Sequence, residues 1–440
     1  MRGLIKTIYG TPGYLKVVEW TTLIGITGSA QVVIQALGLI SGILVVRLLP
    51  TPEYGFYTLA NTMLGTMTIL ADGGITNAVM AQGGKVWQNK ERLGTIIATG
   101  LELRKKFAIG SLIVAIPILF YLLHHHKASL LTTALIAASI VPAFVAALSG
   151  TILQTGLTLH QDIRPLQKNN LAVNALRFLL LVLSLFVFPW AFIAILASGL
   201  PQIWGNIRLR NLSAQYADWN SKADDAVRKE VLVFVKRVLP GAVYYCLSGQ
   251  ITIWLISILG STNALAQVGA LGRLSMVLNV FNIVFATLIV PRFARLPNDK
   301  KLIRSRYLLI QLCLLIISFS LVASVWFFPQ QILTILGNKY SNLEAELVLS
   351  VLGSCLGLMA GASFGLCSSR AWAIHPALAI SVSLASILIG ILFLDISTLR
   401  GVLIFNLLLM SIEVVMYLIY SLYKIQTSNR TNALPQLLNY

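Results

Sequence analysis

Four ionisable side chains interrupt long apolar stretches of this sequence. They are Asp72, Arg177, Arg273 and Glu413, so each half of the chain holds one acid and one base in such a position. An ionised group surrounded by apolar residues is costly unless it has a partner or faces water. Each is therefore a candidate for chemistry: an arginine can hold an anion with its planar fork, and a carboxylate can relay a proton or a sodium ion.

Polar residues at helical spacing accompany these charges. Asn170, Asn174 and Arg177 follow an i, i+4, i+7 pattern, which places them on one face of a helix. Such a face avoids lipid and turns to a neighbouring helix or to a water-filled pathway. The pathway residues predicted on these grounds are Arg177, Arg273, Arg47, Asn170, Asn174, Gln31, Gln35, Asn279 and Asn282, and Asp72 and Glu413 are the predicted ion-coupling residues.

The alternative is that the charges are structural. Asp72 would then pair with Arg177, and Glu413 with Arg273, so that each half neutralises itself. Arg47 would extend its guanidinium to the lipid headgroups.

The composition indicates that lipid surrounds these residues. The 440-residue chain is 57% hydrophobic and 11% charged, against about 25% charged in soluble domains. Apolar segments long enough to span a bilayer predict an all-α membrane protein with twelve transmembrane helices. The predicted spans are 23–46, 55–80, 107–123, 128–152, 169–188, 190–207, 238–259, 265–290, 307–328, 346–368, 376–395 and 400–422.

The distribution of Lys and Arg predicts the orientation. With both termini in the cytoplasm, most of the 33 basic residues fall in cytoplasmic segments, as the positive-inside rule requires. The net charge of +18 is then explained by topology and anionic lipid, and no nucleic-acid partner is expected.

The loop lengths predict two six-helix lobes. The longest polar connection, 208–237, separates the spans into two sets of six with the same rhythm of loops. Many transporters consist of two such repeats with the substrate site between them. The predicted order is an interfacial N-terminus (1–22), an N-lobe (23–207), a cytoplasmic linker (208–237), a C-lobe (238–423) and a cytoplasmic tail (424–440).

Catalytic and metal-binding patterns are not found. The run His124-His125-His126 points in different directions around a helix, whereas zinc needs about four convergent ligands. There is no Ser-His-Asp arrangement or phosphate-binding loop, and neither an enzyme nor a resident cofactor is expected.

Short motifs resemble a known family. The stretches RLLP (47–50), EYGFY (53–57) and DGG (72–74) resemble the Wzx-type polysaccharide transporters of the multidrug/oligosaccharidyl-lipid/polysaccharide flippase superfamily. The segment 268–293 is similar to the matching hairpin of the second half.

The resemblance implies a V-shaped pair of six-helix lobes, like that of multidrug transporters in the same superfamily. It implies a flippase that moves undecaprenyl-diphosphate-linked oligosaccharide from the cytoplasmic to the periplasmic leaflet of a bacterial inner membrane. The product would serve O-antigen, capsule or exopolysaccharide synthesis, with a polysaccharide polymerase and a chain-length regulator as protein partners and a proton or sodium gradient as driving force.

Two alternatives remain open. A multidrug or cation antiporter of the same superfamily would favour acids over arginines in its cavity, and this chain is balanced. A membrane glycan polymerase would be expected to carry a large basic periplasmic loop, but the predicted outside loops are short and nearly free of charge.

Overall fold

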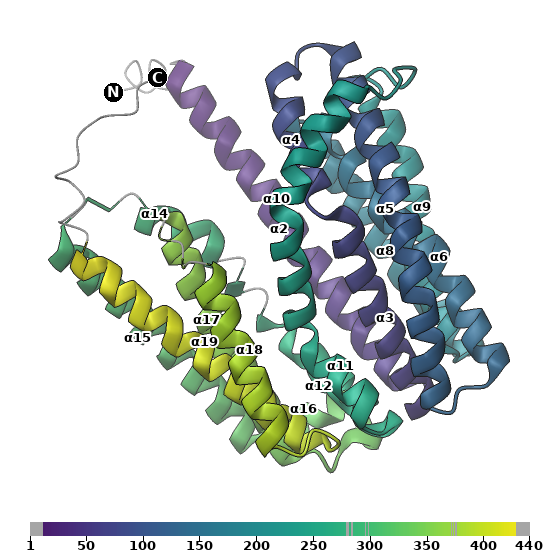
Figure 1. Ribbon diagram of the computed structural model, residues 1–440, viewed down its shortest axis with the longest axis vertical. Helices are drawn as coiled ribbons and strands as arrows, with labels where there is room; N and C mark the ends of the chain where they lie inside the picture. Colours follow the sequence, from purple (N-terminus) through teal and green to yellow (C-terminus); the bar gives the residue numbers. More distant parts are fainter. Residues whose placement is uncertain are drawn as a thin grey trace, which may run out of the picture. The chain divides into compact units, whose positions relative to one another are not determined.

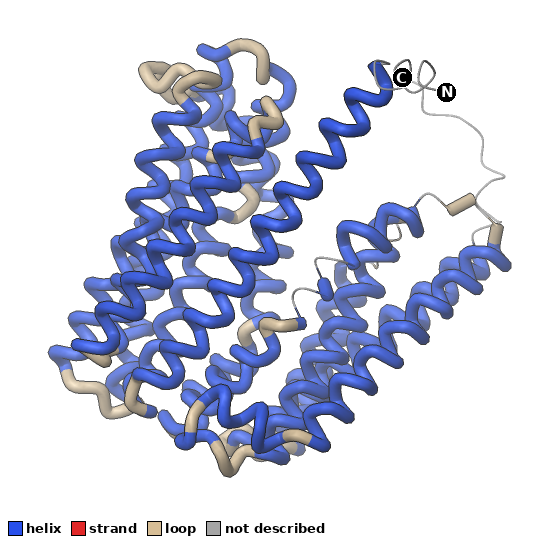
Figure 2. Tube along the Cα trace, turned by 180° about the vertical axis from the view of Figure 1, so that it is seen from behind, coloured by secondary structure: helices blue, strands red, loops and turns tan. Residues whose placement is uncertain are grey.

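The computed structural model is helical wherever it describes regular structure (Figures 1 and 2). It describes residues 12–278, 281–282, 285–294, 296–297, 299–370, 372, 374 and 376–427, and no strand occurs among them. The predicted all-α class is therefore confirmed.

The chain divides into two compact units, Met1–Gln250 and Ile251–Tyr440. This boundary lies beyond the predicted linker because α10 packs against α3, α4 and α5 of unit 1. The helices of unit 1 are α2 (Pro12–Leu48), α3 (Thr51–Asp72), α4 (Ile75–Val86), α5 (Lys90–His125), α6 (Leu130–Leu153), α7 (Thr155–Leu159), α8 (Ile163–Val187), α9 (Ala191–Ser213) and α10 (Asp225–Gly249).

Unit 2 begins with short helices and ends with long ones. Its core is a layer of buried side chains from α15, α17 and α19, among them Tyr307, Leu366 and Val414. Its elements are α11 (Ile251–Leu259), α12 (Thr262–Ser275), a π-helical turn (Phe285–Ile289), α14 (Val290–Ala294), α15 (Lys300–Phe327), α16 (Pro329–Leu336), a 3-10 turn (Asn338–Tyr340), α17 (Glu344–Ser369), α18 (Pro376–Phe393) and α19 (Leu399–Thr427).

Apolar side chains cover the outside of many helices. Phe186, Phe319 and Phe393 are each more than two thirds exposed, a pattern that soluble proteins avoid over large areas. Among the described residues, seven helices are long and apolar enough to cross a membrane. The remaining predicted spans fall on helices that are shorter, broken or more polar. The protein is a multi-pass membrane protein.

Unit 1 is a bundle held by close helix packing. Helix α6 packs against α9, α9 against α8, and α8 against α2, while α3 lies against α5, α6 and α9. Glu53 near the start of α3 accepts a hydrogen bond of 2.7 Å from the backbone N–H of Ala191. The first turn of α9 has unpaired N–H groups that favour a carboxylate. Glu53 therefore fixes the beginning of α9 to α3.

A glycine pair breaks the second predicted span. Gly73 and Gly74 have φ values of 47° and 92°, in the left-handed region that favours glycine, and they separate α3 from α4. Side chains of α10 lie against both glycines. A Cβ atom on Gly73 would lie 3.0 Å from Cδ1 of Leu239. The break thus turns the chain and admits α10 at close range.

The predicted linker 208–237 is attached to α5 by side-chain contacts. It contains the end of α9 and the beginning of α10. In the connection between them, the backbone N–H of Asp224 donates to Oγ1 of Thr99 at 3.0 Å. At the start of α10, Arg228 pairs with Glu102 at 3.0 Å. These contacts attach the connection to the first half of α5.

The α6–α9 contact depends on glycine at position 199. A Cβ atom there would lie 2.7 Å from Cβ and 2.9 Å from Cα of Ala143, closer than packed atoms approach. We expect Gly199→Ala to lower the free energy of unfolding by about 1–3 kcal/mol, because the two helices must separate. Thermal unfolding of the detergent-purified protein measures this.

Gly110 on α5 provides the matched control, because nothing lies within 4 Å of a Cβ built there. Gly110→Ala should leave the melting temperature unchanged or raise it, since alanine favours a helix over glycine. Equal melting temperatures for the two variants would contradict the close α6–α9 contact.

Candidate functional site

The polar stripe predicted from spacing lies on α8. Asn170, Asn174 and Arg177 are all half-buried. The side-chain nitrogen of Asn174 donates to the carbonyl oxygen of Asn170 at 2.8 Å, one turn earlier. This bond satisfies the side-chain N–H of Asn174 within the helix. The rest of this face of α8 stays polar.

The side chain of Arg177 lines a cavity inside unit 1. The cavity has a volume of about 330 Å³ and is lined by residues of α3, α6, α8 and α9. Its wall is rich in amide and hydroxyl groups, which suits a ligand with many hydroxyls. The lining residues are Asn61, Leu64, Ala143, Ala147, Gly150, Thr151, Gln154, Arg177, Ser198, Gly199 and Gln202, and we call this space the Arg177 cavity.

The guanidinium of Arg177 is only partly satisfied by the protein. Its Nε donates to the carbonyl oxygen of Ser198 at 3.0 Å, the only hydrogen bond of this side chain within the described residues. It forms no ion pair within the same residues. Since guanidinium carries five N–H donors in a fork, the free donors can grip an anion with two parallel bonds.

A second arginine nearby is fully engaged. Arg104 of α5 is 5% exposed and forms an ion pair with Asp72, the last residue of α3. The Nε of Arg104 donates to Oδ1 of Asp72 at 3.0 Å. Its two terminal nitrogens donate to Asp72 and Thr76 and to the carbonyl oxygen of Leu148. The pair ties together α3, α4, α5 and α6.

Thr151 connects this ion pair to the Arg177 cavity. Its hydroxyl accepts a hydrogen bond of 2.6 Å from Arg104 and its residue also lines the cavity. The cavity wall is further ordered by Gln202, which donates to Oδ1 of Asn206 at 3.0 Å, while Asn206 donates to the carbonyl oxygen of Ala146 at 2.7 Å. The cavity wall therefore holds ordered polar groups and one arginine that forms no ion pair within the described residues.

The expected pairings of the alternative interpretation do not form. Asp72 pairs with Arg104 and not with Arg177, because the break at Gly73 places the carboxylate beside α5. In unit 2, Glu413 of α19 and Arg273 of α12 are both half-buried, and neither an ion pair nor a hydrogen bond joins them. A terminal nitrogen of Arg273 lies 3.9 Å from the sulfur of Met276.

The other predicted pathway residues are scattered over both units. Gln31 and Gln35 are half-buried on α2, and Arg47 is exposed at its end. Asn282 in unit 2 is exposed, and Asn279 lies outside the described residues. Within unit 1, the structure brings only Arg177 of this set into the cavity.

Sequence reasoning missed Arg104. The predicted third span began at 107, with Arg104 in a cytoplasmic loop, but α5 begins at Lys90. One signal was available: Ile97, Gly100, Arg104 and Ala108 are spaced 3, 4 and 4, so Arg104 continues a buried face. A cation on such a face predicts an acidic partner from another helix.

A family model described as polysaccharide biosynthesis protein matches residues 44–345, more than half of the chain. The chain belongs to this family. The matched part of this polysaccharide biosynthesis protein contains α3 to α16, and thus the Arg177 cavity and the Asp72–Arg104 pair.

Solved structures show that the family member has a known transporter fold. Lipid II flippase MurJ in an inward closed conformation matches with a TM-score of 0.71 and 13% identity, over 94% of this chain and 94% of that one. An inward-facing multidrug resistance MATE family transporter of the MOP superfamily matches with a TM-score of 0.69 and 14% identity, over 91% of this chain and 96% of that one.

A third structure, a MOP superfamily transporter from Pyrococcus furiosus, has a TM-score of 0.63 and 14% identity over 92% of this chain and 95% of that one. No curated protein sequence matches. The chain thus combines membership of the polysaccharide biosynthesis family with the fold of MurJ and of MATE family transporters, the fold that the motif resemblance predicted.

The Asp72–Arg104 pair should be a main contributor to stability. Replacing Asp72 with alanine leaves a buried cation without its counter-charge, which costs about 3–5 kcal/mol. We expect Asp72→Ala to lower the melting temperature strongly, and Asp72→Ala/Arg104→Met to recover part of the loss. Thermal unfolding in detergent measures both.

Glu102→Gln is the control, since the Glu102 pairs with Lys106 and Arg228 lie at the surface, where ion pairs contribute little. If Asp72→Ala melted at the same temperature as Glu102→Gln, the buried pair would not hold the four helices together.

Proposed function

We propose that the protein is a flippase for undecaprenyl-diphosphate-linked oligosaccharide units. It moves them from the cytoplasmic to the periplasmic leaflet of a bacterial inner membrane during synthesis of O-antigen, capsule or exopolysaccharide. Both termini lie in the cytoplasm, as the distribution of basic residues predicts. The family and the fold shared with a lipid II flippase support this substrate class.

The observation that carries the proposal is the state of Arg177. Its side chain lines the Arg177 cavity, which has a volume of about 330 Å³. Its guanidinium has no carboxylate partner among the described residues. A cation in that state, within a membrane protein, is suited to an anionic ligand. A diphosphate offers the planar, bidentate acceptors that guanidinium prefers.

The remaining cavity groups suit the sugar. The amides of Asn61, Gln154 and Gln202 and the hydroxyl of Ser198 can exchange hydrogen bonds with sugar hydroxyls as these leave water. The prenyl chain needs no cavity, because it can stay in lipid against the apolar outer faces of the helices. No bond is made or broken during transport: the protein only replaces the hydration of the polar head.

Transport of the oligosaccharide head follows an alternating-access cycle. In this cycle, water reaches the polar stripe of α8 first from one side of the membrane and then from the other. Cysteines placed at Asn170 and Asn174 should then be labelled by water-soluble reagents from both sides. Failure to label from either side would rule out this pathway.

Gradient coupling is best assigned to Glu413. Both Asp72 and Glu413 are candidates, but Asp72 is held by Arg104. Glu413 is half-buried and has no ion pair or hydrogen bond within the described residues, so it is available to a proton or sodium ion.

The same feature of Glu413 favours the alternative function, a multidrug or cation antiporter, since an unpaired acid can bind a lipophilic cation. The polymerase and chain-length regulator of the pathway are proposed protein partners.

Replacing Arg177 should block transport at the cytoplasmic side. In a strain without the gene, Arg177→Ala should restore surface polysaccharide at no more than about one tenth of the wild-type level, as loss of one charged hydrogen-bonding group costs about 1.5–3 kcal/mol. Lipid-linked units should accumulate in the cytoplasmic leaflet. Leaflet-resolved extraction of these units, with surface glycan staining, measures both.

Arg210→Ala is the matched control, because this exposed arginine of α9 stacks on Trp219 and does not line the Arg177 cavity. It should restore surface polysaccharide fully. Full restoration by Arg177→Ala at equal protein level would exclude Arg177 from the pathway, and cation efflux would become the function to assay.

A further inference from the structure

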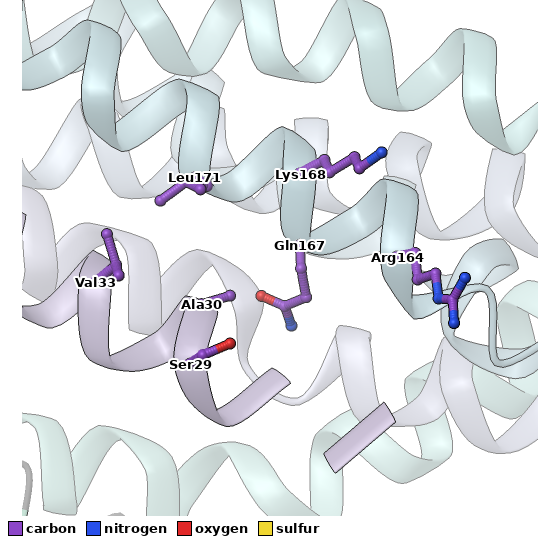
Figure 3. Close-up of a pocket in the computed structure, with 7 residues that line it drawn as sticks. All are labelled: Ser29, Ala30, Val33, Arg164, Gln167, Lys168 and Leu171. Carbon is purple, nitrogen blue, oxygen red and sulfur yellow. The ribbon is translucent and has the colours of Figure 1, made fainter. Parts of the chain in front are cut away.

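A second cavity lies between α2 and α8, separate from the Arg177 cavity. It has a volume of about 580 Å³ and shares no residue with the first. Figure 3 shows its walls, which combine two cations, one buried amide and apolar side chains. We call it the α2–α8 groove, and its lining residues are Ser29, Ala30, Val33, Arg164, Gln167, Lys168 and Leu171.

Gln167 carries a buried hydrogen-bond acceptor to which no described residue donates. The side chain is 8% exposed and points from α8 toward α2 (Figure 3). Its Oε1 is buried and has no hydrogen-bond partner among the residues that the structure describes. Buried polar atoms in native proteins nearly always have a partner, and leaving one without costs about 1–3 kcal/mol. A ligand that brings a hydroxyl or an N–H group into the groove would satisfy this acceptor.

The same groove is positively charged. Arg164 and Lys168 project toward the beginning of α8 (Figure 3), and neither forms an ion pair within the described residues. They stand in the first two turns of a 25-residue helix, whose N-terminal end attracts anions. The acid nearest in sequence, Asp162, does not line the groove and accepts a hydrogen bond of 2.8 Å from the Tyr216 hydroxyl.

Apolar contacts complete the groove. Ala30 and Val33 of α2 face Leu171 of α8 across it. A ligand that fits all three features has an anionic phosphate, a hydroxyl-bearing group beside it and a hydrocarbon chain. A sugar linked to a lipid through a diphosphate has this chemistry.

The groove and the Arg177 cavity lie at different heights and on different sides of α8, the groove toward α2 and the cavity toward α6 and α9. Arg164, Gln167, Asn170, Asn174 and Arg177 are spaced 3, 3, 4 and 3 along the helix. The thirteen residues from Arg164 to Arg177 rise about 20 Å. Because successive members are three or four residues apart, a polar stripe winds around α8 by about 140° from the groove to the cavity, and this path favours a transported ligand over a resident lipid.

We propose that the α2–α8 groove is the loading site for the diphosphate head of the lipid-linked oligosaccharide, an inference that rests on the proposed function. Arg164 and Lys168 bind the diphosphate, Gln167 accepts a hydrogen bond from the first sugar, and Ala30, Val33 and Leu171 contact the start of the prenyl chain. The head then passes along the stripe to Arg177.

Binding to the purified full-length protein in nanodiscs tests the site. The probes are a short-chain prenyl diphosphate, the same molecule carrying one N-acetylglucosamine, and phosphatidylglycerol, measured by native mass spectrometry. We expect Arg164→Gln/Lys168→Gln to weaken binding of both prenyl diphosphates at least tenfold. Gln167→Leu should weaken only the glycosylated probe, by about threefold to tenfold, since it removes one acceptor and no charge.

The control is Arg208→Gln/Arg210→Gln, which removes two charges from α9 outside the groove and should leave binding unchanged. Unchanged binding in Arg164→Gln/Lys168→Gln would overturn the loading site and leave the proposed function standing. Phosphatidylglycerol could also bind the wild-type protein as tightly as the prenyl diphosphates and lose binding in Arg164→Gln/Lys168→Gln. That result would overturn the loading site and assign the groove to a resident lipid. Wild-type protein that binds neither prenyl diphosphate would contradict the proposed function itself.

Discussion

The structure depends on one constraint: a charge placed among apolar helices needs a partner. Arg104 meets it with Asp72, two threonines and a backbone carbonyl, and this network joins four helices of unit 1. Arg177 meets it only in part, through the carbonyl oxygen of Ser198. Intramembrane arginines serve structural and ligand-binding roles. Arg104 serves the first, and we propose the second for Arg177.

The helix packing brings these two arginines to one wall. The α6–α9 contact is close because Gly199 lies against Ala143, and the break at Gly73 and Gly74 turns the chain after Asp72. Thr151 of α6 then belongs both to the Arg104 network and to the Arg177 cavity. A change in how α6 sits against α9 would therefore reach the ion pair and the cavity together. A bundle with this coupling is suited to switching between two packed arrangements.

Much of this could be predicted from the sequence, and the failures have physical causes. Hydropathy gave the helical membrane class, and the spacing of Asn170, Asn174 and Arg177 gave the polar face of α8. The partner of Asp72 could not be found in this way. Pairing across helices depends on where the chain turns, and the cluster Arg104-Lys105-Lys106 resembled a loop although Arg104 continues a buried face. Gln167 was missed because one buried amide leaves no periodic signal.

We propose that the Arg177 cavity carries an anionic lipid-linked sugar across the membrane. The most direct measurement is reconstitution of the purified protein in liposomes with a fluorescent polyprenyl-diphosphate disaccharide in one leaflet. We expect the disaccharide to become accessible to a membrane-impermeant lectin in the other leaflet, at a rate that falls at least tenfold with Arg177→Ala. A rate equal to that of protein-free liposomes, together with uptake of lipophilic cations by the same vesicles, would contradict it.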